Sequence, residues 1–139
     1  MKRFAVLSIP LFLAFTIPVH AEDTLYADMG GQAGIDRMVD EVEKIYLADP
    51  RIKDIFAESN MERLNAKLKE DFCMVAGGPC TYTGHSMEAA HKGLHLTNAN
   101  FNALVEDLQS AMDSCNIPFA TQNRFLARLA PMQHQVVTR

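Results

Sequence analysis

The sequence lacks an excess of basic residues. Its 139 residues include 13 lysines and arginines against 17 aspartates and glutamates, which gives a formal net charge of −4 at pH 7. Proteins that bind nucleic acid through the phosphate backbone usually carry a basic patch. No such patch is present, and we therefore exclude nucleic acid as a partner. A phosphate-binding loop, a dinucleotide fingerprint and a nucleophile triad are also missing, so no familiar enzyme motif suggests a reaction.

A membrane-spanning apolar run is also absent. The apolar run Phe4–Pro18 follows two basic residues and is too short, with the wrong flanks, for a stable span. The small residues of Val19-His20-Ala21 then suit a cleavage site. We therefore expect residues 1–21 to be a secretory signal peptide, cleaved near Ala21, and 22–139 to be a single periplasmic or secreted domain with no stable membrane insertion. An uncleaved anchor is the alternative.

Cysteine is scarce, and its spacing argues against a metal cluster. The sequence has three cysteines and no C-x-x-C pair. Cys73 and Cys80 flank a glycine- and proline-containing break, and after export they would meet an oxidising environment. We expect them to form a disulfide that adds about 2–3 kcal/mol of stability on the chain-entropy model. Cys115 would remain a half-buried thiol near a helix end, and a Cys/His metal cluster is the rival reading.

No segment alternates polar and apolar residues over a useful length, which argues against strands. Apolar residues instead recur at helical spacing between glycine, proline and capping residues. The sequence therefore predicts an all-α fold of one domain. The expected helices lie roughly at 24–29, 35–48, 60–75, 86–92, 98–112 and 118–132, with a brief turn over 52–56 and a kink at Pro131.

Two histidines lie four residues apart, at His91 and His95. On one continuous helix this spacing would place both imidazoles on one face, as in a zinc site. Gly93 lies between them and is expected to end the short helix. A lone histidine among apolar neighbours is more often a hydrogen-bonded core residue than a ligand, so spacing alone does not decide the role of His91. A helical module that binds zinc or a partner protein therefore stays an alternative.

The order of these signals resembles the group I truncated haemoglobins, the small two-over-two helical globins. The matching stretches are "LYADMGGQAGI" (25–35), "LADPRIKDIF" (47–56), "GGPCTYTG" (77–84), "MEAAHKGLHLT" (87–97) and "LARLAPM" (126–132). Together they cover nearly all of residues 24–137 with the spacing kept. The resemblance implies a truncated globin, a two-over-two helical sandwich around one haem b (iron protoporphyrin IX).

The resemblance also implies which residues hold the haem. His91 matches the proximal histidine that binds the iron, and a neutral imidazole is a good iron ligand. Apolar walls would hold the porphyrin and limit oxidation by water. The residues expected to line the haem are Phe56, Leu64, Leu68, Met87, Leu94, Leu96 and Phe101.

The distal side departs from the family pattern. Many members place a tyrosine and a glutamine there to hydrogen-bond bound oxygen, whereas this chain has Glu43 at the tyrosine position and Leu64 and Leu68 at the glutamine positions. We expect Glu43 to turn to the pocket edge and pair with Lys67 or Lys44, because an unpaired carboxylate in an apolar pocket is costly. A protonated Glu43 that donates to bound ligand is the alternative.

Three more distal residues complete the expected pocket. Val42 adds an apolar group. Tyr46 lies one turn beyond Glu43, and its hydroxyl could replace the missing tyrosine only if the helix rotates or shifts. Lys67 occupies the position of a sixth iron ligand in some relatives, but a lysine ligates only when deprotonated, so we expect it to pair with a haem propionate.

These features predict a haem protein that binds a diatomic gas, namely oxygen, nitric oxide or carbon monoxide. Without the tyrosine–glutamine network, oxygen release should be fast and autoxidation easier than in members that have it. The alternative is a haem enzyme for nitric oxide dioxygenation or for peroxide or nitrite chemistry. Dioxygenation would also need an electron donor as a partner.

Overall fold

The computed structural model describes residues 24–139, and the expected signal peptide lies outside this range. Every regular element in the described part is helical, so the all-α prediction is confirmed. The elements are α1 (Leu25–Asp28), α2 (Gly31–Ala48), η1 (Lys53–Phe56), α3 (Met61–Val75), α4 (Met87–His91), α5 (Asn98–Ser114), α6 (Phe119–Leu129), η2 (Ala130–Met132) and α7 (Gln133–Val136), where η marks a 3₁₀ helix.

Side-chain caps begin α3 and α5 close to the starts expected from the sequence, whereas α2 begins at Gly31, four residues before its expected start, without a side-chain cap. The Asn60 side chain accepts a hydrogen bond from the Arg63 amide at 2.9 Å and starts α3. Thr97 and Asn100 form a reciprocal capping box that starts α5. Pro131 does not continue α6 as an α-helix, because η2 replaces the last turn before α7 begins. These signals are local, and the structure follows them.

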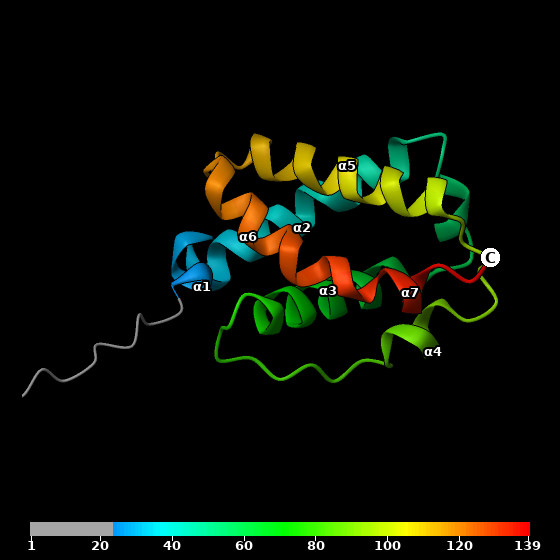
Figure 1. The fold of residues 1–139 in the computed structure, drawn as a ribbon, viewed down its shortest axis with the longest axis horizontal. Coiled ribbons are helices and arrows are strands. Elements are labelled where there is room, and N and C mark those ends of the chain that lie inside the picture. The colour runs from blue at the N-terminus through cyan, green and yellow to red at the C-terminus, as the bar shows by residue number, and fades with distance from the viewer. Residues whose placement is uncertain (1–23) are drawn as a thin grey trace, which may run out of the picture.

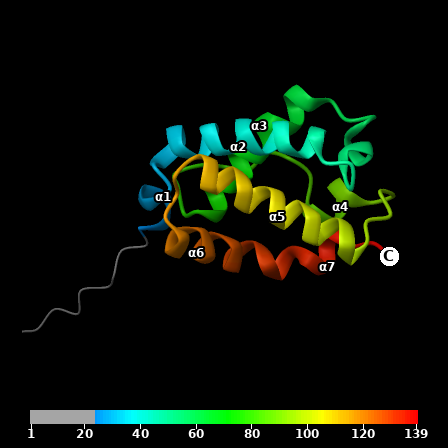
Figure 2. The same ribbon diagram turned by 90° about the horizontal axis from the view of Figure 1, so that it is seen from above.

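Four long helices, α2, α3, α5 and α6, build the body of the molecule. Helix α2 packs against α3 and α5, and α6 packs against α1, α3 and α5 (Figures 1 and 2). The rings of Phe72 and Phe125 meet edge to face, with centroids 5.2 Å apart, and join α3 to α6. No helix within residues 24–139 combines the length and the apolar character needed to cross a bilayer.

The segment between α3 and α4 is long and runs back along α3 before it reaches the short α4 (Figure 1). A disulfide between Cys73 and Cys80 closes its start, with the two Cα atoms 5.9 Å apart. The Arg128 guanidinium on α6 donates to the Val75 carbonyl at 2.8 Å just before the segment begins. Helix α4 then packs beside α7 at the far end of the molecule. Residues of α4 line a cavity.

Candidate functional site

A cavity of about 250 Å³ lies between α3, α4 and α5, and residues from α2, η1 and the α6–α7 region complete its lining. Most of its wall is aliphatic or aromatic, and only a few polar side chains reach it. The lining residues are Tyr46, Ile55, Phe56, Ser59, Leu64, Lys67, Leu68, Asp71, Phe72, Tyr82, Met87, Ala90, His91, Leu94, Leu96, Phe101, Leu104, Val105, Leu108, Leu129, Met132 and Val136. A concave apolar site with few polar groups is typical of a ligand or cofactor pocket.

His91, the last residue of α4, lines this cavity. Its Nδ1 lies 2.7 Å from the carbonyl oxygen of Met87, one turn earlier. A carbonyl only accepts hydrogen bonds, so Nδ1 must carry the proton and donate it. Nε2 then keeps its lone pair, and a backbone bond of this kind is how proteins orient an imidazole that ligates a metal.

His95 does not share the helix of His91. Helix α4 ends at His91, Gly93 follows with φ of +81°, and His95 itself lies exposed with φ of +53°. Among residues 24–139, no group of three or more histidine, cysteine or acidic side chains is placed to hold a metal ion. The i, i+4 geometry that a zinc pair on one helix would need is therefore missing.

The cavity brings together most of the residues that the sequence analysis singled out. On its wall lie His91, Phe56, Leu64, Lys67, Leu68, Met87, Leu94, Leu96, Phe101 and Tyr46. Val42, expected in the distal pocket, is instead fully buried in the core and is not on the wall. It lies one turn before Tyr46, which is the α2 residue that reaches the cavity.

Glu43 is also away from the cavity wall. Its carboxylate accepts a hydrogen bond of 2.6 Å from the Asn65 side chain on α3. The expected pairing with Lys67 or Lys44 is wrong, because Lys44 binds Glu41 at 3.0 Å and Lys67 turns to other partners. The α2–α3 packing brings Asn65 opposite Glu43, and this contact between helices is not visible in the spacing of either helix alone.

Tyr46 lines the cavity, but its hydroxyl is bound to a backbone carbonyl. The ring stacks on Phe56 with centroids 5.5 Å apart, and the hydroxyl donates to the carbonyl oxygen of Leu104 on α5 at 3.2 Å. Burial raises the pKa of this phenol well above its usual range, with a smaller contribution from the charge of Asp107. The hydroxyl thus stays protonated and is already used as a donor, which leaves it unavailable to a ligand in the cavity.

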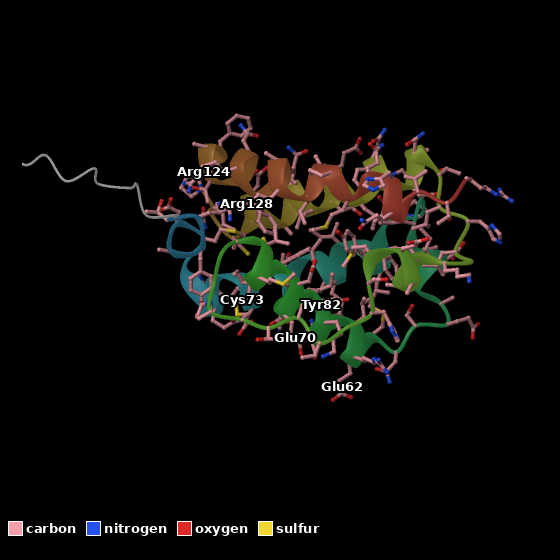
Figure 3. The ribbon with its side chains drawn as sticks, turned by 60° about the horizontal axis from the view of Figure 1, so that its bottom comes forward. Glu62, Glu70, Cys73, Tyr82, Arg124 and Arg128 are labelled. Carbon is pink, nitrogen blue, oxygen red and sulfur yellow. A yellow bond between two sulfur atoms is a disulfide. The ribbon has the colours of Figure 1, made fainter. Side chains whose placement is uncertain are left out.

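Lys67 joins α3 to the segment that precedes α4. Its ammonium lies 2.6 Å from both Glu70 and the hydroxyl of Thr83, and the backbone and hydroxyl of Thr83 each donate to Glu70 at 2.8 Å. The hydrogen bonds from Lys67, followed by those from Thr83, lower the pKa of Glu70 to about 2. This charged network ties the segment to α3 at the cavity edge, and Figure 3 shows Glu70 beside Tyr82 there.

Asp71 and Tyr82 were not among the predicted site residues, yet both line the cavity. Asp71 is only 5% exposed, and burial raises the pKa of its carboxyl to about 6. Tyr82 donates its hydroxyl to the His85 carbonyl at 2.6 Å, and a Cβ at Gly84 would overlap its ring. Asp71 lies three residues after Leu68, so helical spacing from Leu64 and Leu68 was the signal that could have found it.

Comparison with known proteins agrees with this arrangement. Residues 24–138 match the family described as "Bacterial-like globin". A "Group 1 truncated hemoglobin" of Tetrahymena thermophila is 39% identical over 97 residues, which are 69% of this chain and 79% of the relative.

Two solved structures share the fold. The truncated hemoglobin of Tetrahymena pyriformis in its Fe(III) form superposes with a TM-score of 0.80 at 27% identity, covering 83% of this chain and 98% of that one. The 2/2 hemoglobin from Synechococcus sp. PCC 7002, in the cyanomet state with covalently attached heme, gives 0.76 at 28% identity with the same coverage. The chain therefore belongs to the bacterial-like globin family, and its relatives include group 1 truncated haemoglobins.

Proposed function

We propose that the protein holds one haem b in this cavity, with Nε2 of His91 as the proximal iron ligand. The observation that carries the proposal is the Nδ1–H···O=C bond from His91 to Met87, which leaves the Nε2 lone pair available to iron on a mostly apolar wall. Phe56, Leu68, Leu94 and the other apolar lining residues would contact the macrocycle. The donor set and the walls of the cavity both fit this group.

The second part of the proposal is that a diatomic gas (oxygen, nitric oxide or carbon monoxide) is the ligand. Haem iron supplies an open coordination position for such a gas. The cavity residues on α3 at the expected distal positions, Leu64 and Leu68, have no hydrogen-bond donor, and the Tyr46 hydroxyl binds Leu104 instead. Bound oxygen would thus gain little stabilisation, and this favours rapid, reversible gas binding over storage of oxygen.

The visible spectrum of the purified protein tests both parts. With haemin added, the wild type should show an intense Soret band that shifts on reduction and again with carbon monoxide. His91→Ala should lose or shift this band, whereas His95→Ala should leave it unchanged, because His95 is exposed and lies beyond the end of α4. A protein that stays colourless with haemin would overturn the proposal, as would equal spectra for the two variants.

An enzymatic role at the same iron is the competing function. Nitric oxide dioxygenation needs a lasting oxygen complex and an electron donor. The Tyr46 hydroxyl binds the Leu104 carbonyl and therefore does not stabilise an oxygen complex. Nitrate formation sustained over many turnovers, with an electron donor present, would favour the enzyme. A single turnover that stops at the ferric state would favour the gas-binding role.

We further propose that the protein is exported to the periplasm or secreted. The support is the N-terminal pattern of two basic residues, an apolar run and Val19-His20-Ala21, together with the Cys73–Cys80 disulfide, which suits an oxidising compartment. Expression of the full chain in a bacterium, followed by fractionation and mass determination, should yield a mature chain that begins at Glu22. A chain of full mass in the cytosolic fraction would contradict export.

A further inference from the structure

Asp71 is an ionisable residue of the cavity wall that has no role in the proposed haem ligation. It lies on α3 and lines the cavity, is only 5% exposed, and forms no hydrogen bond or ion pair with any residue in the range 24–139. A buried carboxylate without a partner is costly, and such groups are uncommon away from functional sites.

The other titratable groups around Asp71 are already committed elsewhere. Within the cavity, three of them bind backbone carbonyls: Tyr46 binds that of Leu104, Tyr82 that of His85, and His91 that of Met87. The fourth, Lys67, binds Glu70 and Thr83. From the helices packed on α3, Glu43 binds Asn65, Asp40 binds Lys69, and Arg128 donates to the carbonyl of Val75. None of these hydrogen bonds neutralises Asp71.

A haem bound in this cavity would change the electrostatic environment of Asp71. It would displace the water that reaches the carboxyl, which favours the neutral acid. Reduction of the iron would also remove one positive charge from the cavity. In a medium of low dielectric constant, the loss of a nearby positive charge makes a carboxylate harder to keep ionised.

Resting on the haem binding proposed above, we propose that Asp71 carries a proton linked to the redox state of the haem. When an external one-electron donor reduces the bound haem, the Asp71 carboxylate would take up one proton from solvent and become the neutral acid. Oxidation returns the electron to an acceptor and the proton to solvent. The net charge of the cavity is therefore unchanged by the electron transfer.

The sign of the effect follows from this balance. A group that binds its proton more tightly in the reduced state lowers the midpoint potential as the pH rises. The pKa of the Asp71 carboxyl, raised to about 6 by burial, centres the effect near neutral pH. For one proton per electron the limiting slope is about 59 mV per pH unit, because this is the potential equivalent of a tenfold change for one electron.

Potentiometric titration of the haem-loaded protein between pH 4.5 and 8.5 tests the proposal. Asp71→Asn is close in shape but cannot ionise, so its potential should match the wild type at the acid end and lie increasingly above it toward pH 8. Glu62→Gln removes one exposed carboxylate from the first turn of the same helix, away from the cavity, and should follow the wild-type curve (Figure 3).

Identical pH dependence in Asp71→Asn and the wild type would overturn the proposal. A second measurement needs no substitution: carbon-13 NMR of the carboxyl of Asp71 in the diamagnetic ferrous carbon monoxide complex. A midpoint near or above 6 supports the proposal, and a midpoint near 4, as for an exposed aspartate, overturns it. If the protein fails to bind haem at all, the Soret band is absent and the proposed function has failed instead.

Discussion

Reduction of the Cys73–Cys80 disulfide should destabilise the protein by an amount that follows from the loop it closes. The two residues are separated by seven positions. On the chain-entropy model, a loop of this length removes unfolded-state freedom worth about 2.4 kcal/mol at 25 °C. Other contacts remain near the loop in the native state, namely the Glu70–Thr83 hydrogen bonds and the bond from Arg128 to the last residue of α3, Val75, so the fold itself should survive.

The measurement is urea unfolding of the haem-free protein, followed by circular dichroism, with and without a phosphine reductant. The reduced form should unfold at lower urea and give a free energy of unfolding about 2.4 kcal/mol smaller. A Cys73→Ala/Cys80→Ala variant should show a similar loss and then no longer respond to the reductant. Cys115→Ala, which leaves the disulfide intact, is the matched control. A loss below about 0.5 kcal/mol on reduction would refute the loop-closure reasoning.

Three further predictions concern single side chains. Oxygen release measured by stopped flow should be fast, and Tyr46→Phe should leave its rate unchanged. The variant should lower the free energy of unfolding by about 1 kcal/mol, because the hydroxyl bonds to Leu104 and not to a ligand. Slow release in the wild type that becomes faster in the variant would contradict this. Glu70→Gln should flatten the acid limb of a plot of unfolding free energy against pH. The pKa of about 2 for Glu70 in the folded state lies below the ordinary value, so the carboxylate stabilises the fold above about pH 4, and this contribution is lost as the pH falls toward 2. Equal acid limbs for the variant and the wild type would show that the Thr83 network is not stabilising. Thr97→Ala should cost about 1 kcal/mol in urea unfolding through loss of the cap of α5, whereas an unchanged midpoint would mean that the cap does not contribute.

The helix ends could be predicted from the sequence because they depend on neighbouring residues. Asn60 caps α3 through an amide only three residues away, and Gly93 follows α4 in a left-handed conformation that favours glycine. Pro118 likewise precedes α6 directly. The positions that line the cavity were also foreseeable in large part, because the resemblance to the globins maps along the chain at constant spacing.

Partners across helices could not be predicted in the same way. Glu43 pairs with Asn65 because α2 and α3 meet at a particular rotation, and the sequence of one helix does not contain that angle. Asp71 was overlooked because it lies among charged residues in the sequence and reads as part of a solvated face. Its charged neighbour Glu70 binds Lys67 and Thr83, whereas Asp71 lines the cavity together with Phe72, and only the packed structure shows this difference.

The shortness of α4 has a consequence for how the protein would acquire its cofactor. The helix has five residues, one side-chain cap from Ser86, and no fully buried side chain. A helix of this length has little stability of its own in water, so in the haem-free chain its opening should require little free energy. Formation of the bond between His91 and the iron would then be coupled to the ordering of α4. The affinity for haem would include the free energy of ordering α4, and the rate of haem loss would depend on how often α4 opens.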